Sequence, residues 1–281
     1  MKHPASIQPL PLDTADAARS IFNIENVYLS IGDQIDQLFS DLNLAGLDSA
    51  GARQANALCI LAMVTIFQFA ENLPDRLAVE SLRTRTDWKY ALHLSLVSPG
   101  LKPAALCEFR QQLLSNSSGQ PVFHEMLDRL ARLGLLSPRT KNWSDAKSVL
   151  LDVCAISRVD LLAQAFHLTL EALAAYQIEY LREVTLPHWY ERYHRMPAML
   201  PRCASRQDLE SQAGVIGKDT RHLLNAINNS DGMALSHIPE IQDLKRIYQQ
   251  QFDQSGDQIS WLVVCSYCSA MKLSSLHQKP D

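Results

Sequence analysis

The fold is decided by residues 57–114, which read ALCILAMVTIFQFAENLPDRLAVESLRTRTDWKYALHLSLVSPGLKPAALCEFRQQLL. The stretch opens with a nearly unbroken apolar run, Ala57 to Phe67, which is shorter than the roughly 20 residues needed to span a bilayer and suits a buried core helix. Amphipathic segments follow, and they carry the cations Arg76, Arg83, Arg85, Lys89, Lys102 and Arg110. The sequence therefore predicts a buried helix that leads into a basic helical module, and no membrane association.

Turns that contain proline separate these segments. Asn72-Leu-Pro-Asp ends the apolar helix, and Pro74 suits the first turn of the next helix because its missing N–H would be unpaired there anyway. A second turn precedes Pro103, at the expected start of another helix. Short helices separated in this way are typical of a helix-turn-helix module. Packed helical repeats that bind no DNA show the same pattern, so spacing alone leaves both interpretations open.

The composition is that of a globular protein, and the charge is distributed unevenly along the chain. Its 281 residues, 47% of them hydrophobic, are enough to bury a large core. Residues 1–75 carry three Lys and Arg against nine Asp and Glu, whereas residues 76–147 carry eleven against six. The middle third of the chain is therefore the part suited to a polyanion. The polar, proline-bearing residues 1–20 lack the pattern of a secretion signal, so we expect a flexible arm and a cytoplasmic protein.

Apolar spacing predicts helices in most of the remaining chain. Side chains recur every three or four residues from Ile24 to Phe39 and again from Val159 to Tyr180, and a terminal helix is expected from Pro239 to Phe252. Around Trp189, the segment HWYERYHR mixes aromatic residues with cations. Such a mixture can bind nucleic acid by stacking and phosphate contacts, or it can seal a helix junction, which we favour. The fold class is predicted to be all-α.

Several segments in the same order resemble bacterial insertion-sequence DDE transposases. QFAENLPDRLAVESLRTRTDWKYALHLSL and SPGLKPAALCEFRQQLL are similar to their N-terminal domain, as are ENVYLSIGDQIDQLF before them and VFHEMLDRLARLGLL after them. WYERY and the turn at Ile216, Gly217 and Asp219 also have family-like forms. The resemblance covers about residues 21–256. It implies a helical N-terminal domain at 21–140, the start of a catalytic region with a helical insertion at 141–256, and a divergent tail at 257–281.

The resemblance implies that double-stranded DNA, the terminal repeats of the element, is the partner. We choose candidate phosphate contacts for their charge and placement within the basic part of the chain. These nucleic-acid-binding candidates are Arg83, Arg85, Lys89, Arg110, Arg139 and Lys141.

Catalysis in this family depends on three carboxylates that hold two metal ions. Asp145, in SDAKSVL, matches the first of them, but Lys147 and Ser148 stand where the family has threonine and histidine. A cation beside the carboxylate would compete with a metal for its charge. After Gly256 the sequence departs from the family pattern, and the second aspartate and the glutamate are missing. We therefore expect Asp145 to be vestigial, with an ordinary helix-cap or turn aspartate as the alternative.

The truncated resemblance predicts that the RNase-H-like sheet is absent or incomplete, with at most a rudimentary strand near 143–150. No cofactor is expected in this chain, although a complete family member would use Mg²⁺ or Mn²⁺.

Three functions remain open. The first is a DNA-binding, catalytically incomplete transposase. The second is a helical interaction protein that pairs with itself or with an intact transposase. The third is an active, metal-dependent transposase.

Overall fold

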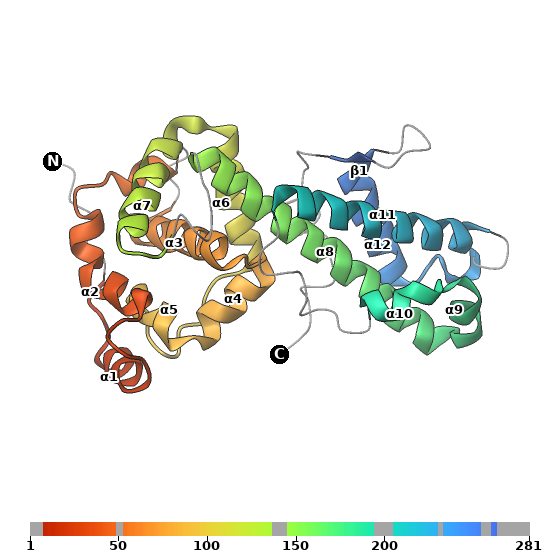
Figure 1. Cartoon of the computed structure of the whole chain (residues 1–281), viewed down its shortest axis with the longest axis horizontal. Coiled ribbons are helices and arrows are strands. Elements are labelled where there is room, and N and C mark those ends of the chain that lie inside the picture. Colours follow the sequence, from red (N-terminus) through yellow and green to blue (C-terminus); the bar gives the residue numbers. More distant parts are fainter. Residues whose placement is uncertain are drawn as a thin grey trace. The chain divides into compact units, whose positions relative to one another are not determined.

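The computed structural model describes residues 8–48, 53–136, 145–193, 205–229, 233–253 and 260–262 (Figure 1). Twelve α-helices account for most of these residues, and a two-stranded ribbon is the only sheet among them. The prediction of an all-α fold is therefore confirmed. The chain divides into two compact units, residues 1–154 (unit 1) and 155–281 (unit 2). This division falls inside a helix.

Unit 1 is built from helices joined by short turns. Its α-helices are α1 (Leu12–Ile21), α2 (Val27–Phe39), α3 (Ala55–Glu71), α4 (Asp75–Thr84), α5 (Thr86–Ala91), α6 (Pro103–Ser115), α7 (Gln120–Arg132) and the first turns of α8 (Ala146–Tyr176). Two short 3-10 helices, η1 (Leu44–Leu47) and η2 (Ser117–Gly119), complete the described part of the unit.

Helix α3 is the centre of the unit 1 core (Figure 1). Leu58, Met63, Val64 and Ile66, which lie on several sides of this helix, are all fully buried. A helix that is apolar all round must be covered all round, and α4, α6, α7 and η1 pack against it. The predicted buried helix is thus confirmed.

Local sequence signals set the helix ends. The Asn26 side chain accepts hydrogen bonds from the backbone N–H groups of Tyr28 (2.9 Å) and Leu29 (3.4 Å), which caps α2. Helix α3 ends at Asn72, whose φ of 56° lies in the left-handed region that terminates many helices. Pro103 opens α6, as its sequence predicts.

The flexible arm predicted for residues 1–20 is wrong from Leu12 onward, because this part forms α1. The helix docks through Thr14, Ala15 and Ala18, all buried, and the Thr14 hydroxyl donates to the backbone oxygen of Leu94 at 2.9 Å. A helix that packs through such small side chains leaves no pattern of bulky apolar residues.

The rudimentary strand proposed near residues 143–150 is not present where the structure describes this segment. Helix α8 begins at Ala146, and residues 143 and 144 lie outside the described part. The long helix predicted across Val159 to Tyr180 is interrupted as well. It ends at Tyr176, Gln177 leaves the helical conformation with φ −152° and ψ 71°, and a new helix follows.

Unit 2 contains the rest of α8 and a set of helices with one ribbon (Figure 1). Its further elements are α9 (Ile178–Val184), α10 (Pro187–Tyr193), α11 (Arg206–Asn228), the 3-10 helix η3 (Met233–Leu235), α12 (Pro239–Gln251), β1 (Phe252–Asp253) and β2 (Ser260–Trp261). The strands pair antiparallel, with Phe252 opposite Trp261.

No single helix in the described ranges has both the length and the apolar composition of a membrane span. Helices α3 and α4 reach that composition only when they are taken together, and they are bent by 109° at the break between them.

Candidate nucleic-acid interface

The break between α3 and α4 forms a sharp corner. Only Asn72, Leu73 and Pro74 separate the two helices, and the Leu73 N–H donates back to the Gln68 oxygen at 2.9 Å. The bend of 109° lies within the range of about 90–120° that helix-turn-helix pairs show. The left-handed Asn72 and the fixed φ of Pro74 explain why the chain turns here.

A buried polar cluster holds this corner from inside. Arg110 of α6 donates through Nη2 to Asp75 Oδ2 at 2.6 Å and through Nη1 to Gln68 Oε1 at 3.2 Å. Gln68 in turn donates to Asp75 Oδ1 at 2.8 Å. These three side chains come from α3, α4 and α6, and all are sealed from solvent. Arg110, a candidate phosphate contact in the sequence, is therefore committed to an internal ion pair.

A second polar cluster surrounds Glu71, the last residue of α3. Arg85 donates to both oxygens of Glu71, at 2.9 and 2.6 Å, and to both oxygens of Asp87, at 3.0 and 2.8 Å. Its guanidinium carbon also lies 4.9 Å from the centre of the Trp88 ring. Such bidentate and stacked geometry suits arginine and no other residue. Arg85 thus joins α3 to the start of α5, and its donors are occupied within the protein.

Tyr28 of α2 joins the same cluster and donates its hydroxyl to Glu71 Oε1. Burial raises the pKa of the Tyr28 phenol well above its usual range, and the charge of Glu71 acts in the same direction. The phenol therefore remains a donor across the physiological pH range. The ring packs edge-on against Phe67, with centroids 4.9 Å apart.

The other sequence candidates occupy different environments. Lys89 is buried, and its ammonium group donates to the backbone oxygen of Leu96. Arg83 is exposed at the end of α4. Arg139 and Lys141 lie outside the described residues. Of the six candidates, the structure thus places Arg83 on the surface and places Arg85, Lys89 and Arg110 in internal contacts.

The outward face of α4 gathers polar side chains at helical spacing. Asp75, Ala78 and Leu82 point into the core, whereas Arg76, Glu80, Arg83 and Thr84 lie on the opposite side, the last three exposed. Lys102, which the sequence candidates omitted, is exposed at the turn before α6. This turn lies against the helix end, because the Arg83 Cγ atom is 3.8 Å from the position of a Cβ atom built on Gly100.

Asp145, the candidate catalytic carboxylate and metal ligand, lies at the start of α8. Its Oδ1 accepts from the Ser148 N–H at 2.8 Å, and the Ser148 hydroxyl donates to the Asp145 backbone oxygen at 2.8 Å. This is the geometry of a helix N-cap, which was the alternative interpretation of the sequence. Within the described part of the chain, no three His, Cys, Asp or Glu side chains come together in a group that could hold a metal ion.

The aromatic and cationic segment around Trp189 seals a helix junction in unit 2. Trp189 and Tyr193 of α10 are buried against Phe166 of α8, with ring centroids 5.0 and 4.6 Å from it. Asp219 of α11 accepts from the Tyr193 hydroxyl at 2.6 Å and pairs with Arg192. Burial raises the pKa of Tyr193, and the bond to Asp219 adds to the shift. The favoured prediction of a sealed junction is confirmed. The turn expected at Ile216, Gly217 and Asp219 is wrong, because these residues lie inside α11.

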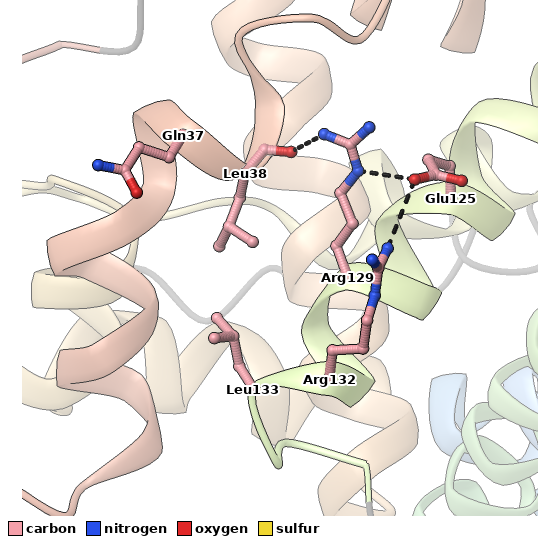
Figure 2. A pocket seen from close by; sticks show the side chains of 6 residues that line it. All are labelled: Gln37, Leu38, Glu125, Arg129, Arg132 and Leu133. Carbon is pink, nitrogen blue, oxygen red and sulfur yellow. Dashed lines mark hydrogen bonds and ion pairs between the residues drawn. The ribbon is translucent and has the colours of Figure 1, made fainter.

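A pocket of about 300 Å³ lies between α2 and α7 (Figure 2). Leu38 and Leu133 point toward each other across it, and Arg129, Arg132 and Glu125 lie on one side. Arg129 donates to Glu125 at 2.8 Å and to the Leu38 oxygen, and Arg132 also approaches Glu125, at 3.6 Å. The charges are therefore paired with one another, and the pocket offers no strong attraction for an anion.

The resemblance to transposases stands on the sequence segments quoted above. No protein-family model, curated protein or solved structure matches the chain. A function must therefore be argued from the helical corner of unit 1 and from the side chains that it presents.

Proposed function

We propose that unit 1 binds double-stranded DNA through α4, and that the chain is a transposase-related DNA-binding protein of an insertion sequence. The observation that carries this proposal is the corner of 109° between α3 and α4, across a turn of three residues. In helix-turn-helix proteins the second helix of such a pair enters the major groove. Here the second helix is α4, and its outward face is polar.

The charges around α4 support a polyanionic partner. Arg83 and Lys102 are both exposed, Arg83 at the end of α4 and Lys102 in the turn before α6, which lies against this helix end at Gly100. Residues 76–147 also carry more cations than carboxylates. Exposed guanidinium and ammonium groups contact phosphates and release the counterions that surround DNA. Arg83 and Lys102 are therefore the phosphate contacts that we propose.

The resemblance supplies the rest of the proposal. The duplex is expected to be the terminal repeats of the element, and the protein to be cytoplasmic and associated with the nucleoid when bound. Binding of this kind needs no cofactor. Strand cleavage is not part of the proposal, because the resemblance supplies Asp145 as one carboxylate where the family uses three.

A salt titration of binding tests the proposal. Fluorescence anisotropy with the full chain and a labelled duplex would measure affinity from about 50 to 200 mM salt, a range over which several phosphate contacts change affinity steeply. We expect Arg83→Ala with Lys102→Ala to weaken binding and to flatten the salt slope by about one unit for each lost contact.

Arg182→Ala on α9 is a matched control. Arg182 is exposed and pairs with Glu179 three residues earlier, as Arg83 pairs with Glu80, but it lies in unit 2. Its removal should leave the slope unchanged. Absence of duplex binding at low salt, or an equal effect of the control, would overturn the proposal.

A second candidate function, self-association or pairing with an intact transposase, is favoured by one observation in unit 2. Tyr176, Ile178 and Tyr190 are 68, 44 and 73% exposed, and α9 contains no buried residue. Exposed apolar side chains of this kind mark interaction surfaces when they are contiguous. Light scattering over a range of concentrations would test the idea. A stable oligomer that ignores DNA at low salt would favour this candidate over the first, and a monomer that binds DNA would exclude self-association.

A further inference from the structure

The presence of Glu80 on the outward face of α4 needs an explanation if this face meets DNA. A carboxylate is repelled by phosphates, and it gains nothing from counterion release. Glu80 nevertheless lies near the middle of the face, one helical turn after Arg76 and one turn before Thr84. In protein–DNA complexes a carboxylate has one favourable use in the major groove, which is to accept a hydrogen bond from the amino group of a base.

Glu80 and Arg83 present an acceptor and a donor side by side. Glu80 Oε2 lies 3.7 Å from Arg83 Nη2, and the two side chains are 53 and 60% exposed. Because exposed pairs of this kind contribute only about 0–1 kcal/mol to stability, the pair is not needed to hold the helix together. Most of the guanidinium donors and one carboxylate oxygen remain available to a ligand.

The edge of a G·C base pair complements this arrangement. In the major groove guanine offers the acceptors N7 and O6, and cytosine offers the donor N4 beside them. Adenine offers a guanidinium only the single acceptor N7 beside the donor N6, so Arg83 could not make there the bidentate contact that guanine N7 and O6 allow. Helix α4 is long enough to lie in the major groove, because it has 10 residues and a helix of this size is about 15 Å long.

We propose that α4 reads a G·C base pair in the major groove, with Arg83 donating to guanine and Glu80 accepting from cytosine N4. This inference rests on the proposed DNA-binding function and gives it a sequence preference. Glu80 adds specificity and lowers general affinity: its charge weakens contact with every duplex, and it recovers that loss only where a cytosine amino group is present.

The two side chains therefore have separable effects. Removing Glu80 should raise affinity for duplexes of arbitrary sequence and reduce the preference at one position. Removing Arg83 should lower affinity for all duplexes and also weaken the preference. If Glu80 had a purely structural role, its removal would not raise general affinity while it lowered the sequence preference.

The test uses the full chain and a duplex library randomised at its central positions. Selection by the wild type should enrich a G·C pair at one position. Competition between the selected duplex and the same duplex with A·T at that position should then show a preference of about 5- to 150-fold, the worth of one good base contact. Glu80→Ala should lower this ratio while affinity for the unselected library rises, and the contact of Arg83 with guanine accounts for the preference that remains.

Glu179→Ala on α9 is the matched control, since Glu179 is exposed and forms the same type of pair with Arg182. It should leave both the ratio and the library affinity unchanged. Binding without any preference, or a preference that is undiminished in Glu80→Ala, would overturn this inference and leave the proposed function in place. Absence of binding to every duplex at low salt would overturn both.

Discussion

Arg110 and Asp75 form an ion pair that solvent does not reach. Nη2 of Arg110 lies 2.6 Å from Oδ2 of Asp75, and the side chains are 0 and 1% exposed. The pair joins α6 to the first residue of α4, and Gln68 ties it to α3. The three helices that form the proposed DNA-binding corner are thus held by charges that face inward.

Breaking this pair should lower the free energy of unfolding of unit 1. Arg110→Ala leaves the Asp75 carboxylate buried without its cation, and such a loss costs about 3–5 kcal/mol. Urea unfolding would measure the free energy. Arg83→Ala is the control, because an exposed pair contributes about 0–1 kcal/mol at most. Equal effects of the two substitutions would contradict the assignment of Arg110 to the core.

Two glycines in helices should respond to alanine in opposite directions. At Gly32 of α2 a Cβ atom would lie 2.7 Å from the backbone oxygen of Tyr90 and 2.6 Å from its ring, so α2 and α5 must move apart. We expect Gly32→Ala to cost about 1–3 kcal/mol, as overpacking does. At Gly214 of α11 a Cβ atom would meet nothing within 4 Å, and alanine there should stabilise by about 0.5–1 kcal/mol.

Thermal unfolding of both variants would test this contrast. A neutral Gly32→Ala would show that α2 and α5 do not approach as closely as described. The sequence alone suggests only that Gly32 weakens its helix, because a close neighbour from a distant segment leaves no local signal.

The sequence predicts the positions of the helices better than it predicts which charged side chains are buried and which partners they bind. Apolar spacing identifies α2 and α12, in which burial of one face imposes the helical period, and a nearly unbroken apolar run identifies α3. Arg83, Arg85 and Arg110 are the same type of residue, yet Arg83 pairs with Glu80 of its own helix, whereas Arg85 and Arg110 pair with carboxylates of other helices. One local signal was available for Arg110: it follows Leu106 by four residues and precedes Leu113 by three, which places it on the buried face of α6.

The ion pair between Asp41 and Arg129 should make stability depend on pH in the acid range. The hydrogen bonds from Arg129, at 2.6 and 2.9 Å, lower the pKa of Asp41. A carboxyl group with a lowered pKa in the folded state stabilises it above the usual range near 3.9, and this contribution is lost as the pH falls below that range. Asp41→Asn should therefore flatten the acid limb of a plot of unfolding midpoint against pH.

Asp36→Asn, which removes an exposed carboxylate of α2, provides the comparison for Asp41. It should keep the acid limb of the wild type. High salt should reduce the difference between Asp41→Asn and the wild type, because exposed charges are screened. Parallel curves for Asp41→Asn and the wild type would show that the pair does not form in solution.

Asp145 should behave as a helix cap. Asparagine caps helices about as well as aspartate, whereas alanine costs about 0.5–2 kcal/mol. We therefore expect Asp145→Asn to preserve the free energy of unfolding and Asp145→Ala to lower it, because only the first keeps an oxygen for the Ser148 N–H. Duplex binding should be the same in both variants, since α4 is untouched. Equal losses of stability would contradict the cap, and metal-dependent strand cleavage that disappears in Asp145→Asn at unchanged stability would make the carboxylate catalytic.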